Sequence, residues 1–343
     1  MNLLIHAYST LEAPQDLAFE HRAASRRSRR TDNLSDDLNR LRDYCVTTAK
    51  DAADTPAIQN LLQHIDRTSH HFSFEIDDAE FATVSKWAWA NNAILYFADG
   101  TVRDPSGRIL MDPASGKPHP DAELPFPADA RQRQLQSEMV MRNRLIDPPE
   151  VLPPIPGMQE VKPRGADDVA WRCLALFLVA ARAESVMAGR PIPLDAIERR
   201  HPLALHALTT AEKSFLQLDR PTPDQAAEHC WRYESLYALQ WALGMHPELE
   251  FADKICDVPT VARLIFAGTE SDFVTTAKLR PTEQILDATD LNLRLLWAAR
   301  DAANRRKDPP AGIDGFVLVE RQHALHWLIA AEGPAWDDVD TST

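Results

Sequence analysis

The chain has 343 residues, of which 44% are hydrophobic and 26% are charged, a composition typical of a globular protein long enough for two domains. Its formal net charge is −14, to which residues 1–165 contribute 19 − 24 = −5 and residues 166–343 contribute 18 − 27 = −9. This acidic balance argues against nucleic acid and anionic membranes as partners.

The cysteines and the apolar runs indicate a cytoplasmic protein. Cys45, Cys173, Cys230 and Cys256 are far apart and form no C-x-x-C pair, unlike the cysteines of a zinc site or a disulfide framework. The apolar run from Leu174 to Ala181 is flanked by arginines and is far shorter than the roughly 20 residues that span a bilayer.

Residues 1–112 are expected to form a small α+β domain. Strands are predicted from Asn2 to Tyr8 and from His71 to Ile76, where HFSFEI alternates apolar and polar residues. The basic run Arg26–Arg30 between them is interpreted as a solvated loop. The other expected elements are helices at 35–53 and from 55 onward, a short helix after Asp78, and three short strands between 94 and 111. We therefore predict an α/β sandwich, with a ferredoxin-like arrangement as one form of it.

Residues 113–163 are expected to form a proline-rich linker. Ten prolines lie between Pro118 and Pro163, too many for long regular structure. One helix, from Ala128 to Arg144, is predicted to interrupt this linker.

Residues 164–343 are predicted to form an all-α domain, because helix signals dominate there and no strand pattern is convincing. Asp167 or Asp168 is expected to cap the first helix. Thr209 and Thr222 each open a capping box, since a glutamate or glutamine follows three residues later. The predicted helices are 167–188, one beginning at 209, 222–244, 257–267, 281–306 and 316–330.

Four segments of this domain mix aromatic, aliphatic and charged residues densely. They are WRYESLYALQWALG at 231–244, RPTEQILDATDLNLRLLWAARDA at 280–302, VLVERQHALHWLI at 317–329 and WDDVDTST at 336–343. Together with the helix that contains Trp171 and Arg172, they resemble the bacterial family known as domain of unknown function 4272. The resemblance covers about Arg142 to Thr343, and it implies a fold but no catalytic residue.

Acidic residues and a histidine recur at helical spacing in these segments. Glu320 and His323 lie three residues apart on the last predicted helix, an arrangement that di-metal helical bundles use. Asp287 and Asp290 form a similar acidic pair, and Glu234 lies on a third helix. The metal candidates are therefore Asp287, Asp290, Glu320 and His323, and the catalytic candidates are Glu320, His323 and Glu234.

A structural role for the same acids is the alternative. Arg232, Arg294 and Arg321 occur beside them and could pair with them in a buried polar network between helices. Only one Glu-x-x-His is present, whereas a ferritin-like site needs two. The number of arginines favours this alternative, and no cofactor is predicted.

Six of the eight tryptophans lie in the predicted helical domain, where a core role and an aromatic ligand pocket are both possible. In the tail, Trp336 is expected to anchor the chain end while the neighbouring aspartates face solvent or a basic partner. The candidate binding residues are Arg232, Tyr233, Arg294, Trp297, Arg321, Trp327, Asp337 and Asp338.

The sequence favours a non-enzymatic protein-interaction module. No complete catalytic motif is present, and an acidic helical domain suits a basic protein partner, as an immunity protein neutralises a toxin. A metal-dependent hydrolase and a small-molecule sensor that uses the helical domain are the alternatives. Neither nucleic acid nor a membrane is expected as a partner, and the oligomeric state is left open.

Overall fold

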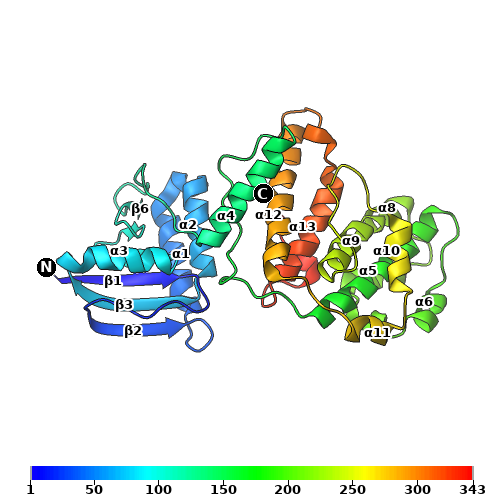
Figure 1. The fold of residues 1–343 in the computed structure, drawn as a ribbon, viewed down its shortest axis with the longest axis horizontal. Helices are drawn as coiled ribbons and strands as arrows, with labels where there is room; N and C mark the ends of the chain where they lie inside the picture. Colours follow the sequence, from blue (N-terminus) through cyan, green and yellow to red (C-terminus); the bar gives the residue numbers. More distant parts are fainter. Residues whose placement is uncertain (1, 342–343) are drawn as a thin grey trace. The chain divides into compact units, whose positions relative to one another are not determined.

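The computed structural model describes residues 2–341, without the side chain of Asp51, and divides the chain into two compact units (Figure 1). The first runs to Gln132 and includes Pro156–Val161, and the second comprises Arg133–Ile155 and the chain from Lys162 onward. An α+β unit precedes a mainly helical one, as the sequence predicts.

The first unit contains a six-stranded sheet in the order β2-β3-β1-β4-β5-β6, and every neighbouring pair is antiparallel. In the central strand β1, Ile5 lies opposite Phe74 of β3 and Phe97 of β4. The strands are β1 Asn2–Ser9, β2 Arg22–Ser28, β3 His70–Asp77, β4 Ala93–Phe97, β5 Val102–Arg103 and β6 Ile109–Met111.

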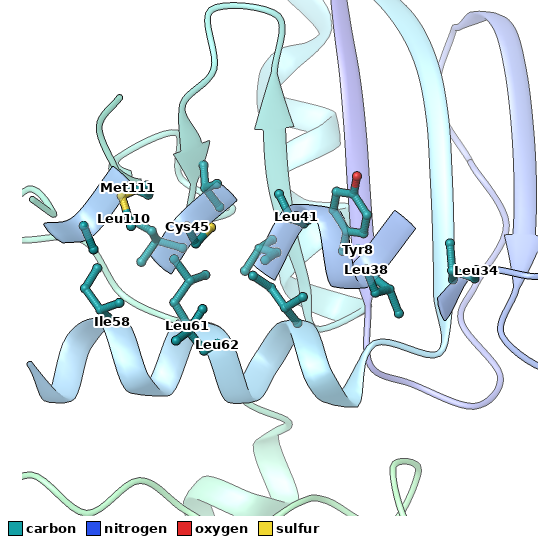
Figure 2. Packing of buried hydrophobic residues seen from close by; sticks show 14 residues of the cluster. Tyr8, Leu34, Leu38, Leu41, Cys45, Ile58, Leu61, Leu62, Leu110 and Met111 are labelled. Carbon is teal, nitrogen blue, oxygen red and sulfur yellow. The ribbon is translucent and has the colours of Figure 1, made fainter. Parts of the chain in front are cut away.

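Helices cover both faces of this sheet because the strands are apolar on both sides. One face carries Ile5, Phe72 and Phe74, which pack with Trp87 of α3 (Phe81–Ala90). The opposite face packs against α1 (Ser35–Ala49) and α2 (Pro56–Arg67). Figure 2 shows side chains of α2 pointing toward those of α1; the labelled residues are Ile58, Leu61 and Leu62 of α2 and Leu38, Leu41 and Cys45 of α1.

Two details of this unit differ from the sequence-based prediction. A ferredoxin-like sandwich has the order β-α-β-β-α-β, whereas the major elements here follow the order β-β-α-α-β-α-β-β-β. The predicted loop at Arg26–Arg30 is partly a strand, because Arg26 and Arg27 belong to β2 and pair with β3. An exposed edge strand with polar side chains lacks the apolar alternation that reveals a strand in the sequence.

The buried His64 in α2 predicts that the stability of the first unit depends on pH. Its Nε2 lies 3.1 Å from the carbonyl oxygen of Tyr8, and burial lowers the pKa of His64 to about 3. Below pH 6.5 the unfolded chain binds a proton at this residue that the folded chain excludes. We therefore expect His64 to reduce the free energy of unfolding by about 1.4 kcal/mol per pH unit as the pH falls from 6.5 toward 3.

Urea unfolding of the wild type and of His64→Gln at several pH values measures this effect. Glutamine retains a side-chain N–H donor for the Tyr8 carbonyl but does not titrate, so the variant should show a shallower loss of stability between pH 6.5 and 4. An identical pH dependence in the two proteins would contradict the assignment to His64.

The second unit consists of helices, and it begins within the long helix α4. The helices are α4 Ala128–Asn143, α5 Ala166–Met187, α6 Leu194–Arg200, α7 Thr210–Leu216, α8 Pro223–Cys230, α9 Arg232–Ala242, α10 Val258–Ile265, α11 Glu270–Thr275, α12 Thr282–Asn304 and α13 Gly315–Ile329. Short 3₁₀ turns occur at Ala204–Ala207, Pro310–Gly312 and Trp336–Asp338; the first unit has two more, at Lys50–Ala52 and Asp78–Glu80. Helix α5 is buried around most of its circumference and packs against α8 and α9.

The local signals for helix ends are mostly confirmed. The capping boxes at Thr209 and Thr222 are both present, and a third, unpredicted one at Thr269 opens α11. The prediction was wrong at α5, whose N-cap is Gly165 rather than an aspartate. The predicted helix 222–244 divides at Trp231, where the tighter i to i+3 hydrogen bond from Glu234 N–H to the Trp231 carbonyl replaces the regular pattern.

Within residues 2–341, no helix is both long enough and apolar enough to cross a membrane. All four cysteines are free thiols, and Cys230 alone among them is only partly buried.

Candidate functional site

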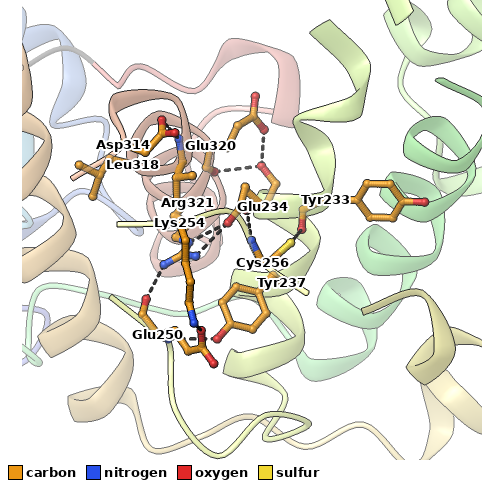
Figure 3. Close-up of polar contacts among 12 residues, drawn as sticks. Tyr233, Glu234, Tyr237, Glu250, Lys254, Cys256, Asp314, Leu318, Glu320 and Arg321 are labelled. Carbon is orange, nitrogen blue, oxygen red and sulfur yellow. Dashed lines mark hydrogen bonds and ion pairs between the residues drawn. The ribbon is translucent and has the colours of Figure 1, made fainter. Parts of the chain in front are cut away.

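Two crossed ion pairs join α9 to α13 within the second unit. Figure 3 shows one of them, between Arg321 and Glu234. Arg232 of α9 lies 2.5 Å from Glu320 of α13, and Arg321 of α13 lies 2.9 Å from Glu234 of α9. Ser235 donates its hydroxyl to the second carboxylate oxygen of Glu320 at 2.7 Å. Each helix therefore supplies one glutamate and one arginine, and the four charged side chains together carry no net charge.

The Arg321–Glu234 pair is the more deeply buried of the two, with side chains only 2% and 3% exposed. One oxygen of Glu234 accepts from Arg321, and the other accepts from the backbone N–H of Cys256. Removing two charges from water is costly, and the cost is offset only when the remaining hydrogen-bonding groups are satisfied. The carboxylate of Glu234 meets this condition, so it is held in one position by groups that a reacting substrate would have to displace.

The same arginine holds the loop that follows α9. Arg321 donates to the carbonyl of Glu250, and its guanidinium carbon lies 5.0 Å from the ring centre of Tyr237. The Tyr237 hydroxyl donates to the carbonyl of Glu248 at 3.1 Å and accepts from the N–H of Glu250 at 3.0 Å. Arg321 and Tyr237 together fix a segment that has no regular secondary structure of its own.

The acids of α12 are also paired with arginines. Asp290 and Arg294 form an ion pair of 2.8 Å between side chains with no exposed surface. Arg294 also donates to the carbonyls of Leu152 and Pro153, at 3.2 and 3.1 Å, and so fastens part of the proline-rich segment to α12. Asp287 pairs at 3.1 Å with Arg133 of α4, a partner that the sequence did not suggest.

His323 does not join Glu320 in an acid–base pair. The carboxylate of Glu320 is engaged by Arg232 and Ser235, while the ring of His323 packs against Trp336 with centroids 4.5 Å apart. Burial lowers the pKa of His323 below its usual value, and the nearby Arg232 guanidinium lowers it further. Its Nε2 has no hydrogen-bond partner among the residues that the structure describes.

The candidate metal ligands Asp287, Asp290, Glu320 and His323 are not grouped around one point. Among residues 2–341, no three histidine, cysteine, aspartate or glutamate side chains are grouped so that they could hold a metal ion. Equal helical spacing does not determine which neighbour a side chain meets. Arginines, rather than one another, are the partners of the acids Asp287, Asp290 and Glu320.

Tryptophans gather near the C-terminal end of α13 around a cavity of about 320 Å³. Trp171, Trp327 and Trp336 line it, and the rings of Trp327 and Trp336 meet edge to face with centroids 5.4 Å apart. Trp336 is 5% exposed and anchors the tail as expected, while Asp337 and Asp338 beside it are exposed. Trp297 lies elsewhere, partly buried against the α12–α13 core.

Arginines cover two of these tryptophans and were not predicted as site residues. The guanidinium carbon of Arg164 lies 4.4 Å from a ring centre of Trp327, and that of Arg172 lies 4.8 Å from a ring centre of Trp336. Arg172 is itself paired with Glu212 at 2.5 Å, and both side chains are buried. The available signal was the position of Arg172 beside the apolar run of α5, because an arginine there is rarely buried unless it is paired.

The family comparison covers the unit that holds these pairs. The family model described as "Domain of unknown function (DUF4272)" matches residues 133–339, which is 207 of the 343 residues. The chain belongs to the DUF4272 family. No curated protein and no solved structure matches it.

The DUF4272 match begins at Arg133, the residue at which the second compact unit also begins. It therefore contains the crossed pairs of α9 and α13, the Asp290–Arg294 pair and the tryptophan cavity. The sheet of the first unit lies outside the matched residues.

Proposed function

We propose that this protein is a non-catalytic interaction module of the cytoplasm whose DUF4272 unit binds a basic protein, in the manner of an immunity protein. The main support is the pairing of the buried acids, because a general acid or base must be free to exchange a proton with a substrate. Glu234 and Glu320 each have both carboxylate oxygens occupied within the protein.

The charge of the chain supports a basic partner. Residues 166–343 carry a net charge of 18 − 27 = −9, and the buried arginines already neutralise the buried acids. The excess negative charge therefore lies on the surface, where it attracts a basic protein over a distance of about 10 Å at ordinary salt concentration. Asp337 and Asp338 belong to this surface and form no ion pair within residues 2–341.

An affinity pull-down of the tagged full-length protein from its native lysate tests the proposal, with mass-spectrometric identification and a salt titration. We expect a stoichiometric basic partner whose retention decreases strongly between about 0.05 and 0.5 M salt. Asp337→Asn/Asp338→Asn should weaken retention about threefold to tenfold, which corresponds to roughly 0.7–1.4 kcal/mol.

The matched control is Asp219→Asn/Asp308→Asn, which removes the same charge from exposed loop positions elsewhere. It should change retention less than twofold. A protein that captures no partner, or a partner that salt does not release, would contradict the proposed function.

The variants Glu320→Gln and His323→Ala test the hydrolase alternative. Both should lower the thermal stability of the protein and should abolish no catalytic activity. A catalytic activity that is lost in both variants would support the hydrolase alternative instead.

A further inference from the structure

A second cavity, of about 300 Å³, lies beside α9 and adjoins the buried Arg321–Glu234 pair, because Glu234 is among its lining residues. Its lining contains two aromatic residues, two aliphatic residues, two cysteines and two glutamates. Arg321 neutralises Glu234, whereas Glu184 forms no ion pair within the described part of the chain. Glu184 belongs to α5. The other lining residues are Cys230, Trp231, Tyr233 and Glu234 around the α8–α9 junction and in α9, and Ile255, Cys256 and Val258 before and within α10. In Figure 3, Tyr233 points away from Arg321.

The carboxylate of Glu184 makes this cavity favour a positive charge. Its hydrogen bond is with the Tyr233 hydroxyl, which donates at 2.8 Å, and it forms no ion pair within the described part of the chain. Tyr233 is 5% exposed, and burial together with this carboxylate raises the pKa of its hydroxyl. Tyr233 therefore stays neutral at physiological pH, and the solvent-exposed Glu184 is the unpaired negative charge at the cavity.

An apolar, aromatic surface surrounds this carboxylate. The ring of Trp231 stacks on that of Phe316 with centroids 5.2 Å apart, and Phe316 is 67% exposed. Ile255 is 58% exposed beside the cavity. Clusters of exposed aromatic and aliphatic side chains mark protein-binding sites, where tryptophan, tyrosine and arginine contribute most of the binding energy.

We infer that this cavity receives an arginine or lysine side chain of the basic partner, with its aliphatic stem against Trp231 and Ile255 and its charged end at Glu184. Both side chains combine an apolar stem with a cationic head, which matches the two parts of the cavity. A guanidinium also stacks favourably on an aromatic ring. This inference rests on the proposed function and gives it a specific contact.

Hexa-arginine and hexa-citrulline peptides test whether the cavity of the full-length protein binds a cationic side chain. Citrulline has nearly the shape of arginine but lacks its charge. Fluorescence anisotropy of the labelled peptides should show binding of hexa-arginine and at least tenfold weaker binding of hexa-citrulline. Glu184→Gln should weaken hexa-arginine binding about fivefold to tenfold. Glu228→Gln, which removes the same charge from an exposed position on α8 outside the cavity lining, should change it less than twofold.

Alkylation of Cys230 locates the bound peptide independently. Cys230 lines the cavity and is the one cysteine that is not fully buried, so bound hexa-arginine should slow its reaction with iodoacetamide, and Glu184→Gln should remove this protection. Equal binding by the two glutamate variants, or unprotected Cys230 in the complex, would overturn the cavity assignment while leaving a partner found by pull-down intact. No hexa-arginine binding at all would also overturn it, and the pull-down then decides separately on the proposed function.

Discussion

Arg321→Met is expected to lower the free energy of unfolding of the second unit by about 3–5 kcal/mol. The substitution leaves the carboxylate of Glu234 buried without its cation, and it removes the donor to the Glu250 carbonyl. Urea unfolding followed by tryptophan fluorescence measures the change, since six of the eight tryptophans lie in residues 166–343.

A double-mutant cycle separates the lost pair from the lost packing. Glu234→Gln together with Arg321→Met should be more stable than Arg321→Met alone, because no buried charge is then left without a partner. The matched control is Lys254→Met, which breaks the exposed pair with Glu250 and should change the unfolding free energy by less than about 1 kcal/mol. Comparable losses for Lys254→Met and Arg321→Met would show that the buried pair has no special role.

Arg294→Met is expected to have an effect of similar size, about 3–5 kcal/mol, and a second, local consequence. Asp290 would keep its charge in a position with no exposed surface, and the carbonyls of Leu152 and Pro153 would lose their donor. The segment around these two residues should therefore detach from α12 more often than in the wild type. Limited proteolysis should show faster cleavage between residues 147 and 155, alongside the lower stability in urea.

Arg305→Met is the control at the C-terminal end of α12, because Arg305 is 62% exposed and its partner Asp301 is 28% exposed. It should leave both stability and the cleavage pattern almost unchanged. If Arg294→Met lowered stability without altering cleavage near Pro153, the arginine would hold Asp290 but would not be needed to fasten the segment.

The sequence determined those elements whose signal lies within a few residues. The alternation in HFSFEI placed β3, and the threonines at 209 and 222, each with a partner three residues later, placed the starts of α7 and α8. It also predicted an α+β unit before a helical one, since strand and helix periodicities are local properties of the chain. The β2 strand escaped prediction because its pairing with β3, rather than its own pattern, makes it a strand.

The tertiary structure alone decided what the charged residues do. The sequence placed Glu234, Asp290 and Glu320 on helices beside arginines, which left a metal site and a buried network both open. The partners Arg232 and Glu320 are 88 residues apart, and Arg133 and Asp287 are 154 apart, so only the packing of α9 on α13 and of α4 on α12 brings them together. For Glu234, Asp290 and Glu320, burial then makes the pairing obligatory, because a carboxylate removed from water needs a cation or several donors. Asp287 is 48% exposed and is not under this constraint.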